Sequence, residues 1–204
     1  MDKTLNRVAI GLRAKTGRAI CVVLGGTIDA PLVIEKFEMA LTDPKIAGTF
    51  QPYHEVMELP WADSQKAVQK FVRAIEKVAR KALGNLARKL QAEGMTVAGV
   101  GIIGAKDRDL SRIGNYHIRA HAAEGVLFRQ VLDEAARTNG LPFKAFPERQ
   151  FAQLLKDELG SKSESIKRKL DEAARALPPP WRADEKLAAT AAWLTLHGLQ
   201  NRER

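Results

Sequence analysis

The sequence has almost no cysteine. Its 204 residues include a single one, Cys21, so the chain can form neither an intrachain disulfide nor a zinc site built from cysteine thiolates. A reducing, cytoplasmic setting fits this composition best. Cys21 lies in the apolar run 19–24, without a basic neighbour that would lower the pKa of its thiol. We interpret Cys21 as a small buried strand residue rather than a nucleophile.

Long apolar segments are also missing. No stretch approaches the roughly 20 consecutive apolar residues of a membrane-spanning helix, and residues 1–7 lack the apolar core of a signal peptide. Hydrophobic residues make up 45% of the chain and charged residues 28%, with only 9 prolines and 15 glycines, which is typical of a globular protein. We expect a soluble, unexported protein with no membrane partner and a single domain over residues 1–204.

Apolar patterns predict a sheet of five strands. Residues 7–14 and 19–24 are expected to pair as a hairpin, and residues 32–41 alternate apolar and polar side chains as a half-buried strand does. Residues 96–105 are apolar without alternation, which is typical of a central strand that is covered on both faces. Residues 141–146 form a short fifth strand in this interpretation.

Helices are predicted between and after the last strands. A long helix is expected over residues 63–92, capped by Asp63 or Ser64, and a second one over residues 116–137. Three further helices are expected at 148–159, 162–177 and 183–199. The last two lie in the C-terminal helical part, residues 160–204.

This order of elements resembles the ribonuclease-H-like superfamily, and in length and layout the chain is similar to the bacterial Holliday-junction resolvases. The similarity runs from Val8 to Leu199, with 141–146 as the fifth strand and 182–188 opening the last helix. It implies an α/β fold: a mixed five-stranded sheet, with three antiparallel strands and then parallel strands, flanked by helices.

The resemblance also implies a nuclease site with acids on the first strand, at the end of the fourth strand and on the last helix. Several carboxylates must converge there, because two divalent ions about 4 Å apart share oxygen ligands. Here the first position falls on Leu12 or Arg13, and the second on Gly101 or Gly104. A cation at the first position would repel metal.

Only the last helix retains acids at the expected place. Asp184 and Glu185 are the catalytic candidates there, whereas Asp107 and Asp109 lie a few residues beyond the fourth strand and would have to move in from a loop. Since two of three positions lack an acid, we do not predict a standard two-metal nuclease. A divalent ion such as Mg²⁺ is compatible with the remaining acids but is not indicated.

Two histidines and a glutamate form a row on the second predicted helix. His117, His121 and Glu124 are spaced i, i+4 and i+7, which places them near one helix face. Such a row can supply a general acid or base or bind a metal, but without a third strong ligand we name no metal. One hypothesis is that the row meets Arg13, and His54 in addition, in one cleft. The alternative is that the histidines line the helix surface and Glu124 faces solvent.

Basic residues are concentrated on the predicted helix 63–92. The chain carries a net charge of +9, and this helix alone has eight basic and two acidic residues, a net +6. Five of the basic residues recur opposite the apolar stripe over roughly 20 Å, at about 1.5 Å per residue; this basic ridge consists of Lys66, Lys70, Arg73, Lys77 and Arg80. The ridge can follow a phosphate backbone, and the alternative is a solvated helix face. Arg13 and Lys15 are further candidates for binding an anion.

Two functional hypotheses remain. The first is a catalytically altered or non-catalytic ribonuclease-H-like protein that binds nucleic acid through the basic ridge. The second is an enzyme that acts on a small anionic substrate through His121, Glu124 and Arg13. Whether the chain is an enzyme stays open at this point, and a homodimer is an expectation from base rates alone.

Overall fold

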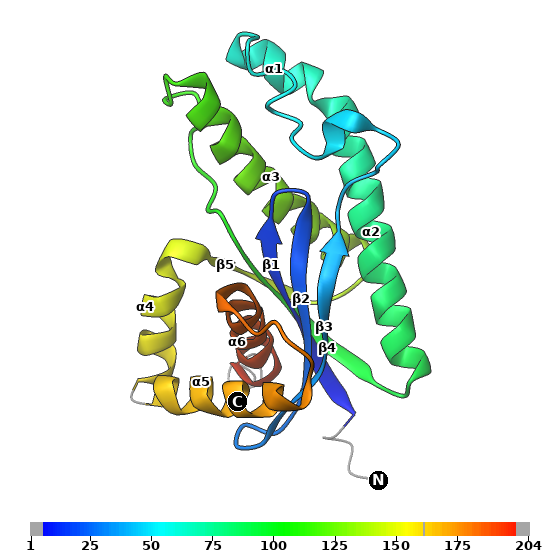
Figure 1. The fold of residues 1–204 in the computed structure, drawn as a ribbon, viewed down its shortest axis with the longest axis vertical. Helices are drawn as coiled ribbons and strands as arrows, with labels where there is room; N and C mark the ends of the chain where they lie inside the picture. Colours follow the sequence, from blue (N-terminus) through cyan, green and yellow to red (C-terminus); the bar gives the residue numbers. More distant parts are fainter. Residues whose placement is uncertain (1–5, 161, 199–204) are drawn as a thin grey trace.

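The computed structural model describes residues 6–160 and 162–198, and it contains one mixed five-stranded sheet (Figure 1). The strands lie in the order β3-β2-β1-β4-β5. Their bounds are Arg7–Lys15 for β1, Arg18–Gly26 for β2, Pro31–Ala40 for β3, Thr96–Gly104 for β4 and Phe143–Pro147 for β5. The first three strands are antiparallel, while β4 is parallel to both β1 and β5. The predicted fold class, an α/β fold on a mixed sheet flanked by helices, is confirmed.

Helices cover both faces of this sheet. Their bounds are Trp61–Ala67 for α1, Gln69–Ala92 for α2, Tyr116–Thr138 for α3, Glu148–Leu159 for α4, Lys162–Ala173 for α5 and Ala183–Gly198 for α6, with 3-10 turns at Ala47–Thr49 and Ala174–Ala176. The helices α2 and α3 pack on one face, and α6 packs on the other with α4 and α5 beside it (Figure 1). Among the described residues, none of the helices has both the length and the apolar character that crossing a membrane requires.

Strand β1 shows how the two faces are separated. Val8, Ile10 and Leu12 belong to the core beneath α2 and α3, whereas Ala9 belongs to the core beneath α6. Successive side chains of a strand point to opposite faces, so residues 9, 11 and 13 face α6. This alternation decides on which side of the sheet each polar residue of β1 can act.

The long helix predicted over 63–92 is divided in the structure. Helix α1 already begins at Trp61, and α2 follows it after Val68, whose backbone stays in the helical region. The amide of Val68 still donates to the Ser64 carbonyl, 3.0 Å away, so the chain keeps its direction. Ser64 does not cap the helix; its hydroxyl donates to the carbonyls of Val56 and Leu59, both at 3.0 Å, and ties the preceding loop to α1.

The C-terminal helices differ from the predicted bounds only at their ends. Helix α4 matches the predicted 148–159, while α5 ends at Ala173 rather than at 177, because a 3-10 turn follows it. The fifth strand begins at Phe143, two residues after the predicted start. Helix α6 begins at Ala183 as predicted, and Leu199, the predicted last residue, lies outside the described residues.

Candidate functional site

Gly101, one of the two residues at which the second implied acid falls, and Gly11, its partner on β1, both lie against the backbone of α6. A Cβ atom on Gly11 would stand 1.8 Å from the carbonyl oxygen of Ala188. Gly101 pairs with Gly11 across the strands, and a Cβ on it would stand 2.5 Å from the carbonyl oxygen of Ala191. Non-bonded atoms cannot approach so closely, so the helix backbone fills the space that an acidic side chain at either glycine would need.

Arg13 occupies the next position of β1 on the same face. Its side chain is only 8% exposed, and its guanidinium forms an ion pair with Glu148, the first residue of α4. The Nε atom also lies 3.5 Å from Oδ1 of Asp184, in the first turn of α6. Lys15 approaches the same carboxylate, with its Nζ 3.1 Å from Oδ2. Two carboxylates therefore converge here on a permanently charged cation and a lysine, in place of a metal.

Other acids that could complete a metal site are engaged elsewhere. Asp107 binds Arg129 and accepts from the Gln130 amide at 2.9 Å. Asp109 accepts from the amide of Ser111 at 3.0 Å; hydrogen bonds from Ser111 lower the pKa of the Asp109 carboxyl. Glu185 accepts from the Arg182 amide at 2.9 Å, at the start of α6. Asp107 and Asp109 therefore do not approach Asp184. Glu185 caps the amino-terminal end of α6 instead of joining Asp184 in a shared site.

Glu148 was not among the residues singled out from the sequence. It follows β5 directly, as the first residue of α4. The available signal was its position, since the carboxyl ends of β1, β4 and β5 share one edge of a sheet whose strands are parallel there. The sequence predicts that β5 ends at residue 146, one residue before its observed end at Pro147. The position of Glu148 at the end of the strand was therefore not apparent.

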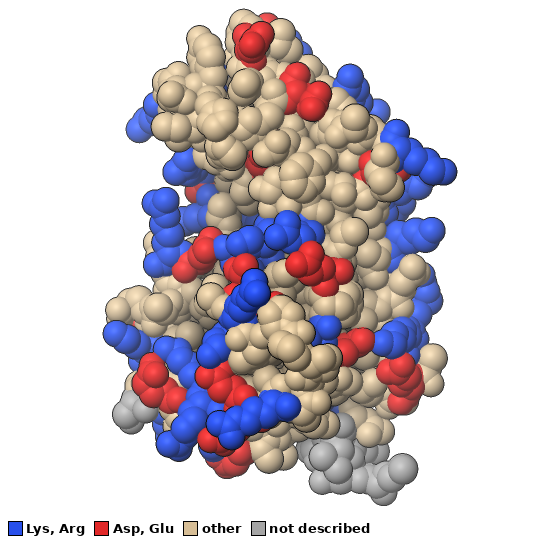
Figure 2. All heavy atoms as spheres, viewed as in Figure 1, with Lys and Arg blue, Asp and Glu red and all other residues tan. Residues whose placement is uncertain are grey.

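The basic ridge lies on the exposed side of α1 and α2. All five of its residues are exposed, and Lys and Arg side chains follow the right-hand edge of the view in Figure 2, over α2. Lys66 has a distant partner, Asp63 at 3.9 Å, and the Lys70 ammonium lies 4.7 Å above the Phe71 ring. In the described part of the chain, no carboxylate lies within 4.0 Å of Arg73, Lys77 or Arg80. Their charges are therefore available to an external anion.

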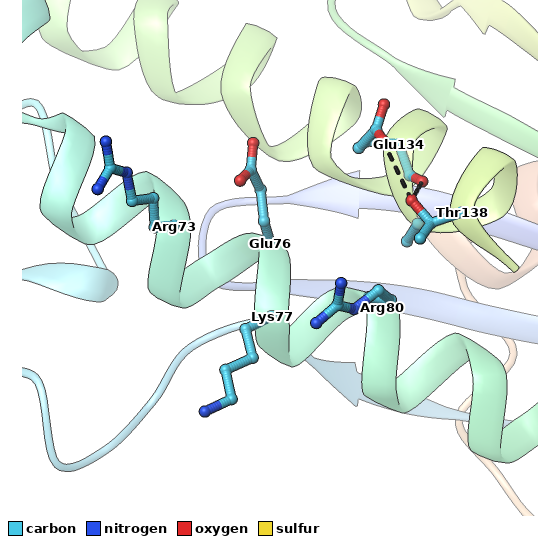
Figure 3. A pocket seen from close by; sticks show the side chains of 7 residues that line it. Arg73, Glu76, Lys77, Arg80, Glu134 and Thr138 are labelled. Carbon is cyan, nitrogen blue, oxygen red and sulfur yellow. Dashed lines mark hydrogen bonds between the residues drawn. The ribbon is translucent and has the colours of Figure 1, made fainter.

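A shallow cavity lies between α2 and α3 along this ridge. Arg73, Glu76 and Arg80 extend toward the side of α3, where Glu134 and Thr138 stand, while Lys77 leans away (Figure 3). Carboxylates from both helices thus share the cavity with the two arginines. The mixed charge of this cavity makes it a weaker anion site than the open surface of α2, where Lys77 extends.

Three histidines meet at the amino-terminal end of α3. His117 and His121 come from the helix, and His54 comes from the loop before α1. The ring centroids lie 4.4 to 5.0 Å apart, and one ring nitrogen from each lies within 4.8 Å of those of the other two. The hypothesis that His54 meets the helical pair agrees with this geometry, although His54 comes from a segment more than sixty residues earlier.

Glu124 lies beneath the histidines and is fully buried. Its Oε1 accepts from Nδ1 of His54 at 2.8 Å and from the backbone amides of Tyr53 and His54 at 3.2 and 3.3 Å. Burial, and then the nearby Glu124 carboxylate, raise the pKa of Tyr53. The hypothesis of a solvent-facing Glu124 is wrong, because the loop carrying His54 covers this side of α3.

Arg13 does not join the histidines. It faces α6, whereas Glu124 and both helical histidines belong to α3 on the opposite side of the sheet. The cleft that would combine Arg13 with His121 and Glu124 is therefore not formed, because residue 13 alternates with the core residue Leu12 that points to α3. A small-anion enzyme that needs these three groups together has no support from this geometry.

The solved structures similar to this chain include two of RuvC. A structure of Thermus thermophilus RuvC matches with a TM-score of 0.52, at 11% identity over 96% of each chain. Another, T. thermophilus RuvC in complex with a Holliday-junction substrate, matches with a TM-score of 0.51, at 12% identity over 97% of this chain and 96% of that one. Neither a family model nor a curated protein sequence matches the chain. At such identities the similarity establishes the architecture, and the fold is RuvC-like.

Proposed function

We propose that this protein binds the phosphate backbone of duplex or branched nucleic acid through its basic ridge and does not cleave it by a two-metal mechanism. The observation that carries the proposal is the ridge itself, five exposed cations along α1 and α2. A rigid helix that presents cations about one turn apart can neutralise several phosphates along one groove edge.

The RuvC-like fold supports a nucleic-acid partner. One of the similar structures, T. thermophilus RuvC, is in complex with a Holliday-junction substrate, and branched DNA is therefore the first substrate to try with this chain. Fold alone does not assign function. The added weight comes from the ridge, because it is a property of this chain's own sequence and surface.

The lack of cleavage follows from the α6 face. A two-metal reaction needs converging carboxylates to hold both ions, but Glu148 and Asp184 are paired with Arg13 and Lys15. Any further acid at Gly11 or Gly101 would collide with α6. Among the described residues, Glu148 and Asp184 on this face are therefore engaged by cations, and the two glycine positions beside them have no space for another acid.

Binding is expected to be largely independent of base sequence. Phe71, the aromatic residue next to Lys70, is buried, so the ridge offers no exposed ring on which a base could stack. Lysine and arginine contacts to phosphate carry no sequence information.

The proposal is tested by fluorescence anisotropy with a labelled duplex and a labelled four-way junction over a range of salt concentrations. If all five cations contact phosphates, the logarithm of the association constant should fall with the logarithm of salt with a slope of about −4 to −5. Replacing Lys70, Arg73 and Lys77 together by glutamine should flatten this slope by about 3.

A matched control replaces cations elsewhere. Lys167 and Arg168 on α5 are paired with Glu164 and Glu172, so glutamine at both positions should leave the slope within about one unit of the parent. Absence of binding at low salt would overturn the proposal. So would binding to which the α5 cations contribute as much as the ridge.

A further inference from the structure

We propose that His54, His117 and His121 form a binding site for a divalent transition-metal ion, best suited to zinc, and that Glu124 positions His54 for it. This proposal rests on the histidine cluster and not on the basic ridge, so it goes beyond the nucleic-acid function. The cluster draws its ligands from two separate segments, the loop before α1 and the first turns of α3.

The spacing of the imidazole nitrogens is close to that of a metal site. The three nitrogen atoms lie within 4.8 Å of one another. Zinc binds histidine nitrogen at about 2.0–2.1 Å in a tetrahedral arrangement, so its ligand nitrogens lie about 3.3 Å apart. Since His117 and His121 are exposed, rotation of their side chains can provide this contraction without moving the backbone.

Glu124 fixes the ring of His54 in the form that binds metal. Its Oε1 accepts hydrogens from three N–H groups, one of which is Nδ1 of His54 at 2.8 Å. A neutral His54 that donates to the Glu124 carboxylate carries its hydrogen on Nδ1, which leaves the lone pair on Nε2. That Nε2 atom is buried and has no hydrogen-bond partner among the described residues. Metal-binding histidines commonly donate their second ring N–H to a carboxylate in this way.

Side-chain contacts fix the position of both segments of the site. Asn115 caps α3, accepting from the Ile118 amide at 2.9 Å, and so fixes the turn that carries His117. On the other side, the Tyr53 ring stacks on Trp61, with centroids 5.6 Å apart, and Ser64 ties down the loop that carries His54. A site with anchored ligands loses little conformational freedom when a metal binds.

The ligand set selects the class of ion. Three imidazole nitrogens favour zinc and its neighbours in the first transition row, whereas magnesium and calcium require oxygen ligands. Glu124 uses Oε1 for its three N–H donors, and neither of its oxygens belongs to the group of ligand atoms within 4.8 Å of one another. The cluster therefore offers three histidine ligands and leaves one position open. Three protein ligands and an open position characterise zinc sites that bind water or an anionic oxygen.

The experiment uses the full-length chain without an affinity tag, stripped of metal by a chelator, and measures Zn²⁺ binding by titration calorimetry in the absence of nucleic acid. We expect one ion per chain. The same chain with Co²⁺ should show the intense visible absorption of a tetrahedral nitrogen-ligated ion rather than the weak absorption of an octahedral one.

Variants identify the ligands. His117→Ala and His121→Ala should each abolish the one-site isotherm, and both should fold because the two side chains are exposed. His197→Gln, in the fourth histidine of the chain on α6, should leave the affinity unchanged. Glu124→Gln should weaken binding about 10- to 100-fold without abolishing it, as expected of a residue that acts through a ligand.

The proposal is overturned if the parent binds no zinc at one site per chain, or if binding survives both His117→Ala and His121→Ala. A loss of binding in His197→Gln equal to that in His121→Ala would also overturn it. These results leave the salt dependence of nucleic-acid binding untouched, so the two proposals fail separately.

Discussion

The two faces of the sheet hold polar clusters of different chemistry. On the α6 face, the guanidinium of Arg13 is opposed by Glu148 and Asp184. On the α3 face, Oε1 of Glu124 accepts hydrogen bonds from three N–H groups. Nε2 of His54 lacks a hydrogen-bond partner among the described residues. The face on which the resemblance implies metal ions holds ion pairs of Arg13 with Glu148 and Asp184, whereas the other face holds three histidine nitrogens within 4.8 Å of one another. Groups able to bind a ligand can thus lie on the face opposite the one that the resemblance indicates.

The largest expected effect comes from placing an acid at Gly11, on the α6 face of β1. Gly11→Asp should destabilise the protein by about 3 kcal/mol or more, because the new side chain must displace α6 from the sheet. The reason is the 1.8 Å separation between a Cβ at this position and the Ala188 carbonyl oxygen. Chemical denaturation followed by circular dichroism measures the change in the free energy of unfolding.

Gly125→Ala is the matched control on α3. Its Cβ would make an ordinary contact, 3.5 Å from the Cβ of Ala105, and alanine is favoured over glycine inside a helix by about 0.5–1 kcal/mol. We therefore expect an unchanged or slightly raised stability. If Gly11→Asp were as stable as Gly125→Ala, α6 could not lie as close to β1 as described.

Much of the fold followed from the sequence because its periodicities are strong. The continuous apolar run of β4 predicts a central strand, and the apolar stripe of α2 predicts an amphipathic helix. The break at Val68 was missed because the apolar stripe continues through it. The tight contact at Gly11 was missed for another reason: the sequence shows that an acid is lacking but not which backbone approaches it.

An intermediate effect is expected from removing the cation on the α6 face. Arg13→Met should cost about 1–3 kcal/mol, since it leaves Glu148 and Asp184 without their buried partner. The loss stays below that of a fully buried pair because these carboxylates are 45% and 34% exposed and can regain water. Thermal or urea unfolding measures the difference.

An exposed ion pair provides the comparison for Arg13. Arg18 lies 3.2 Å from Glu38, with both side chains largely exposed, so Arg18→Met should cost less than about 0.5 kcal/mol. Adding Glu148→Gln to Arg13→Met should recover part of the lost stability, because it removes the carboxylate whose ion pair with Arg13 is lost. Equal losses in Arg13→Met and Arg18→Met would show that Arg13 does not hold the α6 face together.

The smallest expected effect concerns pH and the histidine of the α6 face. Burial, and then the charge of Arg7, lower the pKa of His197 below its ordinary value of 6.5. The unfolded chain therefore binds the proton more readily, and stability is lost as the pH falls through about 6.5. In His197→Gln the loss between pH 7 and pH 5 should be smaller than in the parent. An identical loss in both proteins contradicts this role for His197.

Only part of the candidate site could be predicted from the sequence. The spacing of His117, His121 and Glu124 on one helix face is a local property, so periodicity could show it. Glu148 joins its cluster through tertiary packing, which no local pattern encodes, and His54 could be named as a further member of the histidine cluster but not placed. The hypothesis that combined Arg13 with the histidines was wrong because it did not use the strand alternation that assigns residues 12 and 13 to opposite faces.

The most direct test of the central claim is a cleavage and binding assay on one sample. A labelled four-way junction is incubated with the protein at low salt, with and without Mg²⁺ or Mn²⁺, and both complex formation and strand scission are measured. We predict a complex that dissociates as salt is added, and intact strands in both metals. Metal-dependent cleavage that is lost in Asp184→Asn would contradict the account, because it would show that the α6 face binds catalytic ions despite Arg13.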